Sequence, residues 1–283
     1  MHDDMKSGIH SSPWPALPAS AYLPINRCSL PAAILGGLTF QAHPITLSID
    51  GIAELHRDLW QRLDKLTQHA DRASQFMDYM TVHFLLQEPE RAGYDPQQPY
   101  ARIKMDYLQL LRGWMFDADS REGAVLKGWV ESRFGLLPRW HKGLIRSADD
   151  DTYQNYLHQR TTGIYNTNAL EAQLDLLYTY CQYELAHRYP ETLHVTLYRG
   201  INPEEVTQAM PDKGVMLFNN LNSCSRTQER ADEFGSLVYR VLVPQTKVFY
   251  YSGLLPGRLQ GEDEYIVIGG LYEVERIKTV HID

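Results

Sequence analysis

Two glutamates near the C-terminal end carry the clearest chemical signal in this 283-residue chain. Glu262 and Glu264 stand two residues apart, directly before a β-branched run that starts at Tyr265. Because side chains alternate across a strand, both carboxylates are expected on one face, at the mouth of a strand over 265–268 that the glycines at 269–270 end. Such a pair repels itself and resists burial, which points to a ligand or cation as compensation. A solvated strand end is the plainer alternative for an isolated pair of this kind.

Polar residues upstream of the glutamates add two further elements. Arg199 ends an expected strand, where its planar guanidinium suits a phosphate or a carboxylate, and Gly200 lets a flat ligand approach the backbone. Ser223 and Ser225 flank Cys224 and offer alternating hydroxyls before a short helical turn. Alone, a strand arginine is usually a surface ion pair, and two spaced serines usually cap a turn. The arginine, the two serines and the paired glutamates, taken in this order, are a much more specific signal than any one of the three.

The chain divides into two regions with different secondary-structure patterns, and the elements of these regions position the residues above. Residues 1–20 read as a flexible leader rich in serine and proline, and 21–190 as a mainly helical region. After Pro190 the pattern changes to strand formers, so 191–283 is expected to be a β-rich core and the fold class α+β. The expected helices are a short one capped by Ser29 and ended by Gly36, then 52–66, 76–85, 103–116, 126–134, 153–165 and 170–189, and the expected strands are 193–200, 215–218, 237–243, 247–251 and 265–268.

Composition excludes several classes of protein. The chain is 43% hydrophobic and carries a net charge of -8, so it has no basic surplus for nucleic acid and no apolar run of the length that a membrane span needs. The N-terminus lacks the apolar segment of a signal peptide. Three widely spaced cysteines and scattered histidines give neither a disulfide framework nor a metal site, and a reducing cytoplasm is the expected location.

The order of arginine, serines and glutamates resembles the R-S-E group of mono-ADP-ribosyltransferases. Arg199 falls on the arginine strand of that group, Ser223-Cys224-Ser225 on its Ser-Thr-Ser strand, and Glu262-Asp263-Glu264 on its E-x-E motif. The turn behind the serines also matches, with its alanine and phenylalanine at Ala231 and Phe234. Cys224 is a departure, because the group usually has threonine there, and this puts the role of the middle side chain in doubt.

The resemblance implies a fold, a substrate and catalytic roles. It implies two small packed sheets around a cleft that binds NAD as the substrate, and no metal. Glu264 is expected to stabilise the positive charge that develops on the ribose as nicotinamide leaves, as carboxylates do in glycosidases. Glu262 is expected to bind an acceptor guanidinium and take up its proton, because a free guanidinium is a poor nucleophile. The E-x-E form of the motif is the one that the group uses for arginine acceptors.

Five residues are expected to hold NAD by the same resemblance. Arg199 would bind its phosphates or ribose, and Gly200 its amide through the backbone. Ser223 would support Glu264 or bind the ribose, with Ser225 one step further away. Phe234 would stack on the nicotinamide ring, although a core position is an equal alternative for a phenylalanine. A loop over 252–261 is where the group recognises its target, with Leu254, Leu255 and Arg258 as candidate contacts.

The long helical region, with the segment 26–31 near its start, resembles the branch of the group that modifies the iron protein of nitrogenase. This implies dinitrogenase reductase as the protein substrate, modification of one arginine that reversibly inactivates nitrogen fixation, and a PII-type signal protein as activator. Two alternatives stay open: an ADP-ribosylating toxin or effector that acts on another protein's arginine, and a non-catalytic NAD-binding module.

Overall fold

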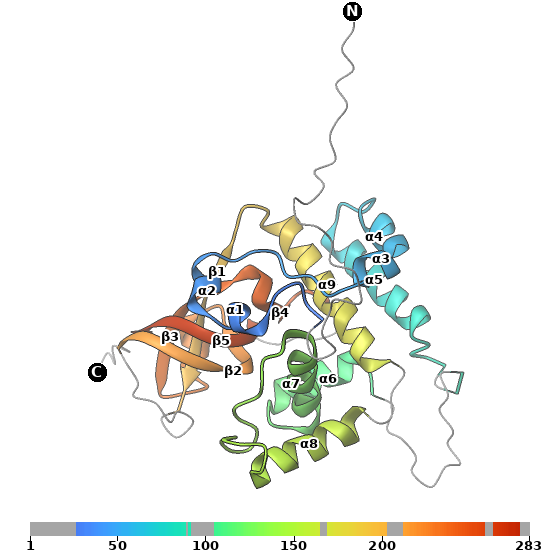
Figure 1. Cartoon of the computed structure of the whole chain (residues 1–283). Coiled ribbons are helices and arrows are strands. Elements are labelled where there is room, and N and C mark those ends of the chain that lie inside the picture. The colour runs from blue at the N-terminus through green and yellow to red at the C-terminus, as the bar shows by residue number, and fades with distance from the viewer. Residues whose placement is uncertain are drawn as a thin grey trace, which may run out of the picture.

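The structure, a computed structural model, describes residues 27–88, 90–91, 105–164, 169–202, 212–257 and 263–277. Helices come first and strands follow, so the predicted α+β class is confirmed (Figure 1). Among the described helices, none combines the length and the apolar character that crossing a bilayer requires. The helices before the strands are α1 (Ala32–Leu35), α2 (Leu38–Ala42), α3 (Ile52–Leu55), α4 (Arg57–Leu63), α5 (His69–His83), α6 (Tyr107–Phe116), α7 (Arg121–Phe134), α8 (Asp151–Ile164) and α9 (Leu170–Arg188).

The strands form one antiparallel sheet whose pairings close on themselves. The strands of the described residues are β1 (His194–Ile201), β2 (Lys213–Ser225), β3 (Leu237–Pro244), β4 (Val248–Tyr251) and β5 (Glu264–Ile277), with the short helix α10 (Gln228–Asp232) between β2 and β3. β2 pairs with β5, the end of β5 with β3, β3 with β1, and β1 returns to β2 through Tyr198 and Ser225. The expected two small sheets are therefore joined by hydrogen bonds into one, with β4 added on β5.

The glycines at 269–270 do not end the last strand, contrary to the sequence prediction. β5 runs through them to Ile277 because β2 has an irregularity between Phe218 and Leu221 that brings the two backbones unusually close. A Cβ on Gly269 would lie 1.6 Å from the carbonyl oxygen of Asn219, so no other residue fits there. The glycines thus permit close contact within a long strand.

The helical region is built around α9, which packs on β4 and on α6. Two buried ion pairs fix it. Arg72 of α5 binds Glu184 through Nε at 2.7 Å and Nη2 at 2.8 Å. Arg133 of α7 binds Asp175 through Nε at 2.7 Å and Nη2 at 2.9 Å, and the indole of Trp129 donates to the same carboxylate at 2.7 Å. Paired guanidinium and carboxylate groups offset much of the cost of burying the charges.

The first described segment, which contains α1 and α2, lies against the sheet, although the strands of the sheet come much later in the sequence (Figure 1). Leu271 N donates to Gly36 O at 2.8 Å. The amide of Gln41 on α2 donates to Leu242 O at 3.0 Å and to Glu273 O at 3.3 Å, and accepts from Glu273 N at 2.7 Å. One side chain therefore bridges β3 and β5 beyond the point where they stop pairing. The domain boundary near residue 190 stays a prediction.

Two expected helices differ in their details. The stretch expected as one helix over 52–66 breaks at His56, which is buried, has φ -107° and ψ 28°, and contacts the hydroxyl of Tyr79 through Nδ1 at 3.0 Å. The short first helix is preceded by Pro31 instead of Ser29, whose hydroxyl accepts a hydrogen bond from Ser48 N at 3.3 Å.

Candidate active site

Three strands converge where Glu264 begins β5. Glu264 is the register partner of Ser225 on β2, and Ser225 is in turn the partner of Tyr198 on β1. Ser252 holds the Glu264 backbone from the other side, since its Oγ accepts from Glu264 N at 3.1 Å and its N donates to Glu264 O at 2.8 Å. Asp263, directly before it, has a positive φ of 53°. The start of β5 is therefore fixed on both sides by backbone contacts.

The carboxylate of Glu264 lies in a compact group of donors. Its Oε1 accepts from Ser223 Oγ at 2.5 Å and from the indole Nε1 of Trp114 at 3.2 Å. The same indole N–H lies 2.9 Å from Ser223 Oγ, so the three side chains form a triangle. Burial raises the pKa of Glu264 above its ordinary value, although the two hydrogen bonds and the charge of Arg230 act to lower it. A carboxylate that is costly to ionise, and whose oxygen is held by two neutral donors, suits a site where positive charge develops during a reaction.

Arg199 lies beside this group. Its Nη1 donates to the carbonyl oxygen of Ser223 at 2.6 Å, and its guanidinium lies 5.5 Å from the ring centre of Phe218. The side chain is only partly buried, so one bond ties it to the serine strand while other donors remain for a ligand. Gly200 packs tightly on α10, where a Cβ would lie 2.0 Å from Ala231 O. That contact alone requires glycine at 200, and its predicted role toward the nicotinamide amide stays a prediction.

The Ser-Cys-Ser stretch places its members on opposite faces of β2. Ser223 points to Glu264, whereas Cys224 is buried in the hydrophobic core together with Tyr272. Burial raises the pKa of the Cys224 thiol to about 11, so the thiol stays protonated and inert. The cysteine therefore substitutes for threonine at a packing position, outside the group of donors around Glu264. Ser225 is also buried and forms the backbone junction between β1 and β5.

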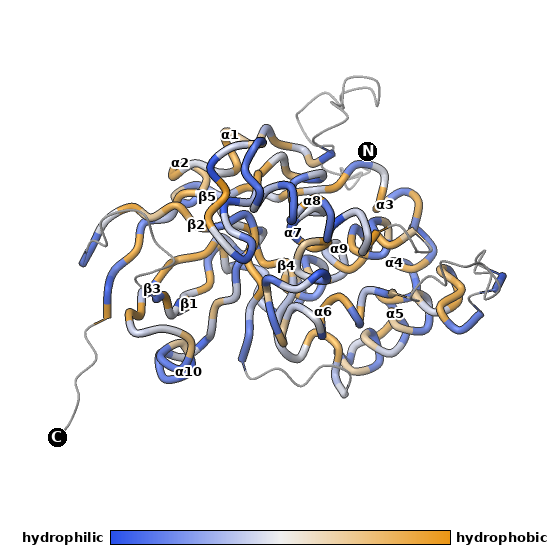
Figure 2. The backbone as a smooth tube through the Cα atoms, turned by 90° about the horizontal axis from the view of Figure 1, so that it is seen from below, coloured by the Kyte–Doolittle hydropathy of each residue, from blue (hydrophilic) through white to orange (hydrophobic). Residues whose placement is uncertain are grey.

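Phe234 is not a core residue, which was the alternative at this position. Its side chain is 59% exposed and lies 5.1 Å from the guanidinium of Arg230, measured to the ring centre. It follows α10, a hydrophilic turn that packs beside β1 and β3 (Figure 2). An exposed ring next to the strands that carry Arg199 and Ser223 is available for stacking on a flat ligand.

Two predicted site residues lie outside the described residues. They are Glu262, the proposed acceptor glutamate, and Arg258 of the loop that precedes it. The loop leucines Leu254 and Leu255 are described and are fully buried. They belong to the hydrophobic core, so the hypothesis that they contact a target protein is wrong.

Trp114 is the residue at this site that the sequence did not indicate. Its helical spacing with Leu110 and Leu111 predicts only a core position, and Trp114 is indeed 2% exposed. The available signal was chemical: a buried indole N–H needs an acceptor, and an apolar helix face supplies none. Nothing in the spacing identifies Glu264 and Ser223, more than a hundred positions away, as those acceptors.

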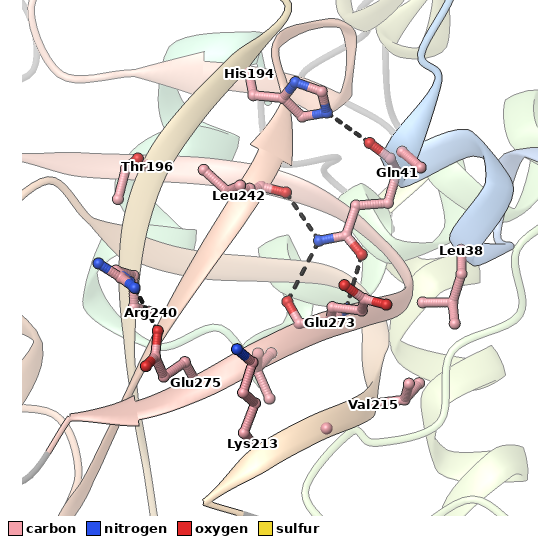
Figure 3. A pocket seen from close by; sticks show the side chains of 13 residues that line it. Leu38, Gln41, His194, Thr196, Lys213, Val215, Arg240, Leu242, Glu273 and Glu275 are labelled. Atoms are coloured by element: carbon pink, nitrogen blue, oxygen red, sulfur yellow. Dashed lines mark hydrogen bonds and ion pairs between the residues drawn. The ribbon is translucent and has the colours of Figure 1, made fainter.

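A groove of about 720 Å³ lies elsewhere on the sheet (Figure 3). Its walls combine Lys213 and the Arg240–Glu275 pair with exposed Leu242 and the amide of Gln41. None of the predicted site residues lines it. The groove is therefore distinct from the site around Glu264.

Comparisons with known proteins show the family of the chain. Residues 25–276 match the family model described as dinitrogenase reductase ADP-ribosyltransferase (DRAT). The chain is 35% identical over 258 residues to the NAD(+)–dinitrogen-reductase ADP-D-ribosyltransferase of Rhodospirillum rubrum, an alignment that covers 88% of this chain and 93% of the relative. No solved structure matches it. These matches place the chain among the NAD-dependent ADP-ribosyltransferases. Within that class, it belongs to the dinitrogenase reductase ADP-ribosyltransferase family.

Proposed function

We propose that this protein transfers ADP-ribose from NAD to an arginine of dinitrogenase reductase and thereby inactivates nitrogen fixation. The observation that carries the proposal is the triangle of Glu264, Ser223 and Trp114 at the junction of three strands, with Arg199 one hydrogen bond away. The family to which the chain belongs, and the name of the R. rubrum relative, support the choice of NAD and of this acceptor protein.

The proposed reaction exchanges one bond at the ribose. The bond between ribose C1′ and the nicotinamide nitrogen breaks, neutral nicotinamide leaves, and a guanidine nitrogen of the acceptor bonds to C1′ while losing a proton. Glu264 stabilises the positive charge on the sugar as it forms, and Ser223 and Trp114 keep the carboxylate in place for this. Glu262 binds the acceptor guanidinium and takes up the proton.

The remaining residues bind the dinucleotide in this proposal. Arg199 has free donor capacity for a phosphate or a ribose hydroxyl beyond its bond to Ser223 O. Phe234 presents an exposed ring for stacking, and it lies against the guanidinium of Arg230, which is paired with Glu233. Gly200 supplies backbone groups for the nicotinamide amide. The acceptor protein and a PII-type activator would contact surfaces that include the helical region.

The deciding experiment incubates the purified protein with labelled NAD and dinitrogenase reductase, then maps the modified residue by mass spectrometry. We expect label on one arginine with the wild type and a loss of about 10³-fold in rate with Glu264→Gln, which keeps the shape and removes the charge. A rate near wild type for this variant would remove the catalytic assignment. Label on other proteins of a lysate, with none on dinitrogenase reductase, would favour an effector with another target. NAD binding without any turnover would favour a binding module.

A second variant separates the two glutamates. With Glu262→Gln, transfer to arginine should fail while slow hydrolysis of NAD continues, because Glu264 still stabilises the sugar. Hydrolysis is followed as release of nicotinamide in the absence of acceptor. If both reactions survive equally, Glu262 has no role in activating the acceptor.

A further inference from the structure

We propose that Trp114, from the helical region, is a positioning residue that fixes the Glu264 carboxylate and the Ser223 hydroxyl for the transfer reaction. The inference rests on the proposed function of Glu264 and adds a residue that the family's arginine, serine and glutamate pattern does not contain. It is carried by one indole N–H that lies 3.2 Å from Glu264 Oε1 and 2.9 Å from Ser223 Oγ.

The triangle has a defined direction of hydrogen bonding. An indole nitrogen only donates, so at Trp114 both contacts point from the ring toward oxygen. Ser223 then accepts from Trp114 with a lone pair and donates its own proton to Glu264 Oε1 at 2.5 Å. The tryptophan therefore sets the rotation of the serine hydroxyl as well as supplying a second donor to the carboxylate. Within the described part of the chain both of these bonds fall on Oε1, so the oxygen assigned to the ribose is Oε2.

The ring itself has no freedom to move away. Trp114 is 2% exposed, and the ammonium of Lys127 on α7 lies 5.9 Å from its ring centre. Lys127 is held in turn by Asp119 Oδ1 at 2.6 Å and by Trp140 O at 3.1 Å. A buried cation over one face of the indole, anchored by a carboxylate and a carbonyl, keeps the N–H aimed at the site.

The charge state of Glu264 provides a readout that a purely structural role would not change. The indole donor lowers the pKa of Glu264 against the effect of burial, so losing it raises that pKa further. Activity that needs the ionised carboxylate is lost as Glu264 becomes protonated, and this loss forms the acid limb of the pH–rate profile. Without the indole donor, the acid limb then lies at higher pH. Other titratable groups around the carboxylate are Arg230 of α10, Cys224 of β2 and Tyr250 of β4. Burial raises the pKa values of Cys224 and Tyr250, so both stay neutral across the acid limb.

The test compares Trp114→Phe with wild type for transfer from NAD, measuring kcat, KM for NAD and the pH dependence of kcat. We expect kcat to fall about tenfold or more, which is the usual cost of losing a hydrogen bond to a charged group, with little change in KM. The acid limb of the profile should move to higher pH. Trp114 replaced by β-(3-benzothienyl)alanine, which has sulfur in place of the N–H and the same ring shape, should reproduce both effects if the phenylalanine variant folds poorly.

The matched control is Trp129→Phe. Trp129 is also a buried tryptophan of the helical region whose indole donates to a carboxylate, here Asp175 at 2.7 Å. We expect this variant to lose stability without any movement of the acid limb. Wild-type kcat and an unmoved acid limb in both position-114 variants, with Glu264→Gln inactive, would overturn the role of Trp114 and leave the proposed function standing. If Glu264→Gln is itself fully active, the proposed function fails first.

Discussion

Asp175 and Glu264 each accept a hydrogen bond from a tryptophan indole, yet Asp175 is buried, Glu264 is only partly buried, and their other partners differ. Asp175 in the helical region also receives two hydrogen bonds from the guanidinium of Arg133, at 2.7 and 2.9 Å. Glu264 in the β-rich core receives a serine hydroxyl instead, at 2.5 Å. Burial raises the pKa of Glu264, which means that the fold holds a negative charge there at a cost.

In the proposed reaction, this difference separates a structural carboxylate from a catalytic one. A guanidinium neutralises Asp175 within the fold, so removing either partner leaves a buried charge without its counterpart. The two side chains that donate to Glu264 Oε1 are neutral, so in the proposed reaction its negative charge is available to a cationic sugar. The same residue types therefore stabilise one region and prepare the other for chemistry.

Asp175→Asn should have the largest effect on folding. The substitution leaves Arg133 with the more exposed Glu171, at 3.0 Å, as its remaining carboxylate, and we expect the free energy of unfolding to fall by about 3 kcal/mol. Urea denaturation measures this loss. Glu88→Gln, which breaks the exposed Arg91–Glu88 pair, is the control and should leave the free energy of unfolding close to that of the wild type. If Asp175→Asn lowers the free energy of unfolding as little as the control does, Asp175 does not have the structural role described above.

Glu264→Gln should have the opposite effect on stability while removing activity. A raised pKa means that the folded state binds the proton more tightly than the unfolded chain, so the stability contribution of Glu264 falls as pH rises from the ordinary carboxyl range through the raised pKa. A neutral glutamine escapes that cost. At neutral pH we therefore expect a Tm equal to or above that of the wild type, measured by calorimetry. A clear drop in Tm would mean that Glu264, like Asp175, is needed for folding.

Ser223→Ala should have a smaller effect, confined to catalysis. It removes the shorter of the two hydrogen bonds to Glu264 and one of the two acceptors of the Trp114 indole, so kcat is expected to fall about tenfold. The control is Cys224→Ala, the next residue along the same strand, where the side chain packs in the hydrophobic core and kcat should stay close to wild type. Equal losses at both positions would show that the strand, and not the Ser223 hydroxyl, supports the site.

The sequence predicts most of the fold because its helices and strands have strong periodicity. The expected helices over 126–134 and 170–189 correspond to α7 and α9, the first ended by Gly135 with φ 68° as its sequence indicates. Strand length was harder to predict. The strand expected over 215–218 extends to Ser225, because its partner β5 continues through two glycines that local propensity treats as breakers.

The site could be predicted only where the arginine, serine and glutamate pattern of the resembling family carries it. Arg199, Ser223 and Glu264 are close together in the fold, as their order in the family pattern implies, and their individual roles stay predictions. Trp114 was beyond reach, because its contact with Glu264 spans 150 positions and its local pattern is that of any core tryptophan. The exposure of Phe234 was an open alternative that only the packing of α10 resolves.

The contacts of the first described segment with the sheet have a practical consequence for dissecting this enzyme. A fragment that starts at β1 would contain every residue of the arginine, serine and glutamate pattern, yet it would lack Gln41, which bridges Leu242 and Glu273, and Gly36, which accepts from Leu271. Minimal versions of the catalytic core, whether built in the laboratory or left by gene truncation, would thus leave strand groups exposed and Glu264 without its indole donor. We expect such fragments to be inactive when produced alone and to regain activity only when the missing helices are supplied as a second polypeptide.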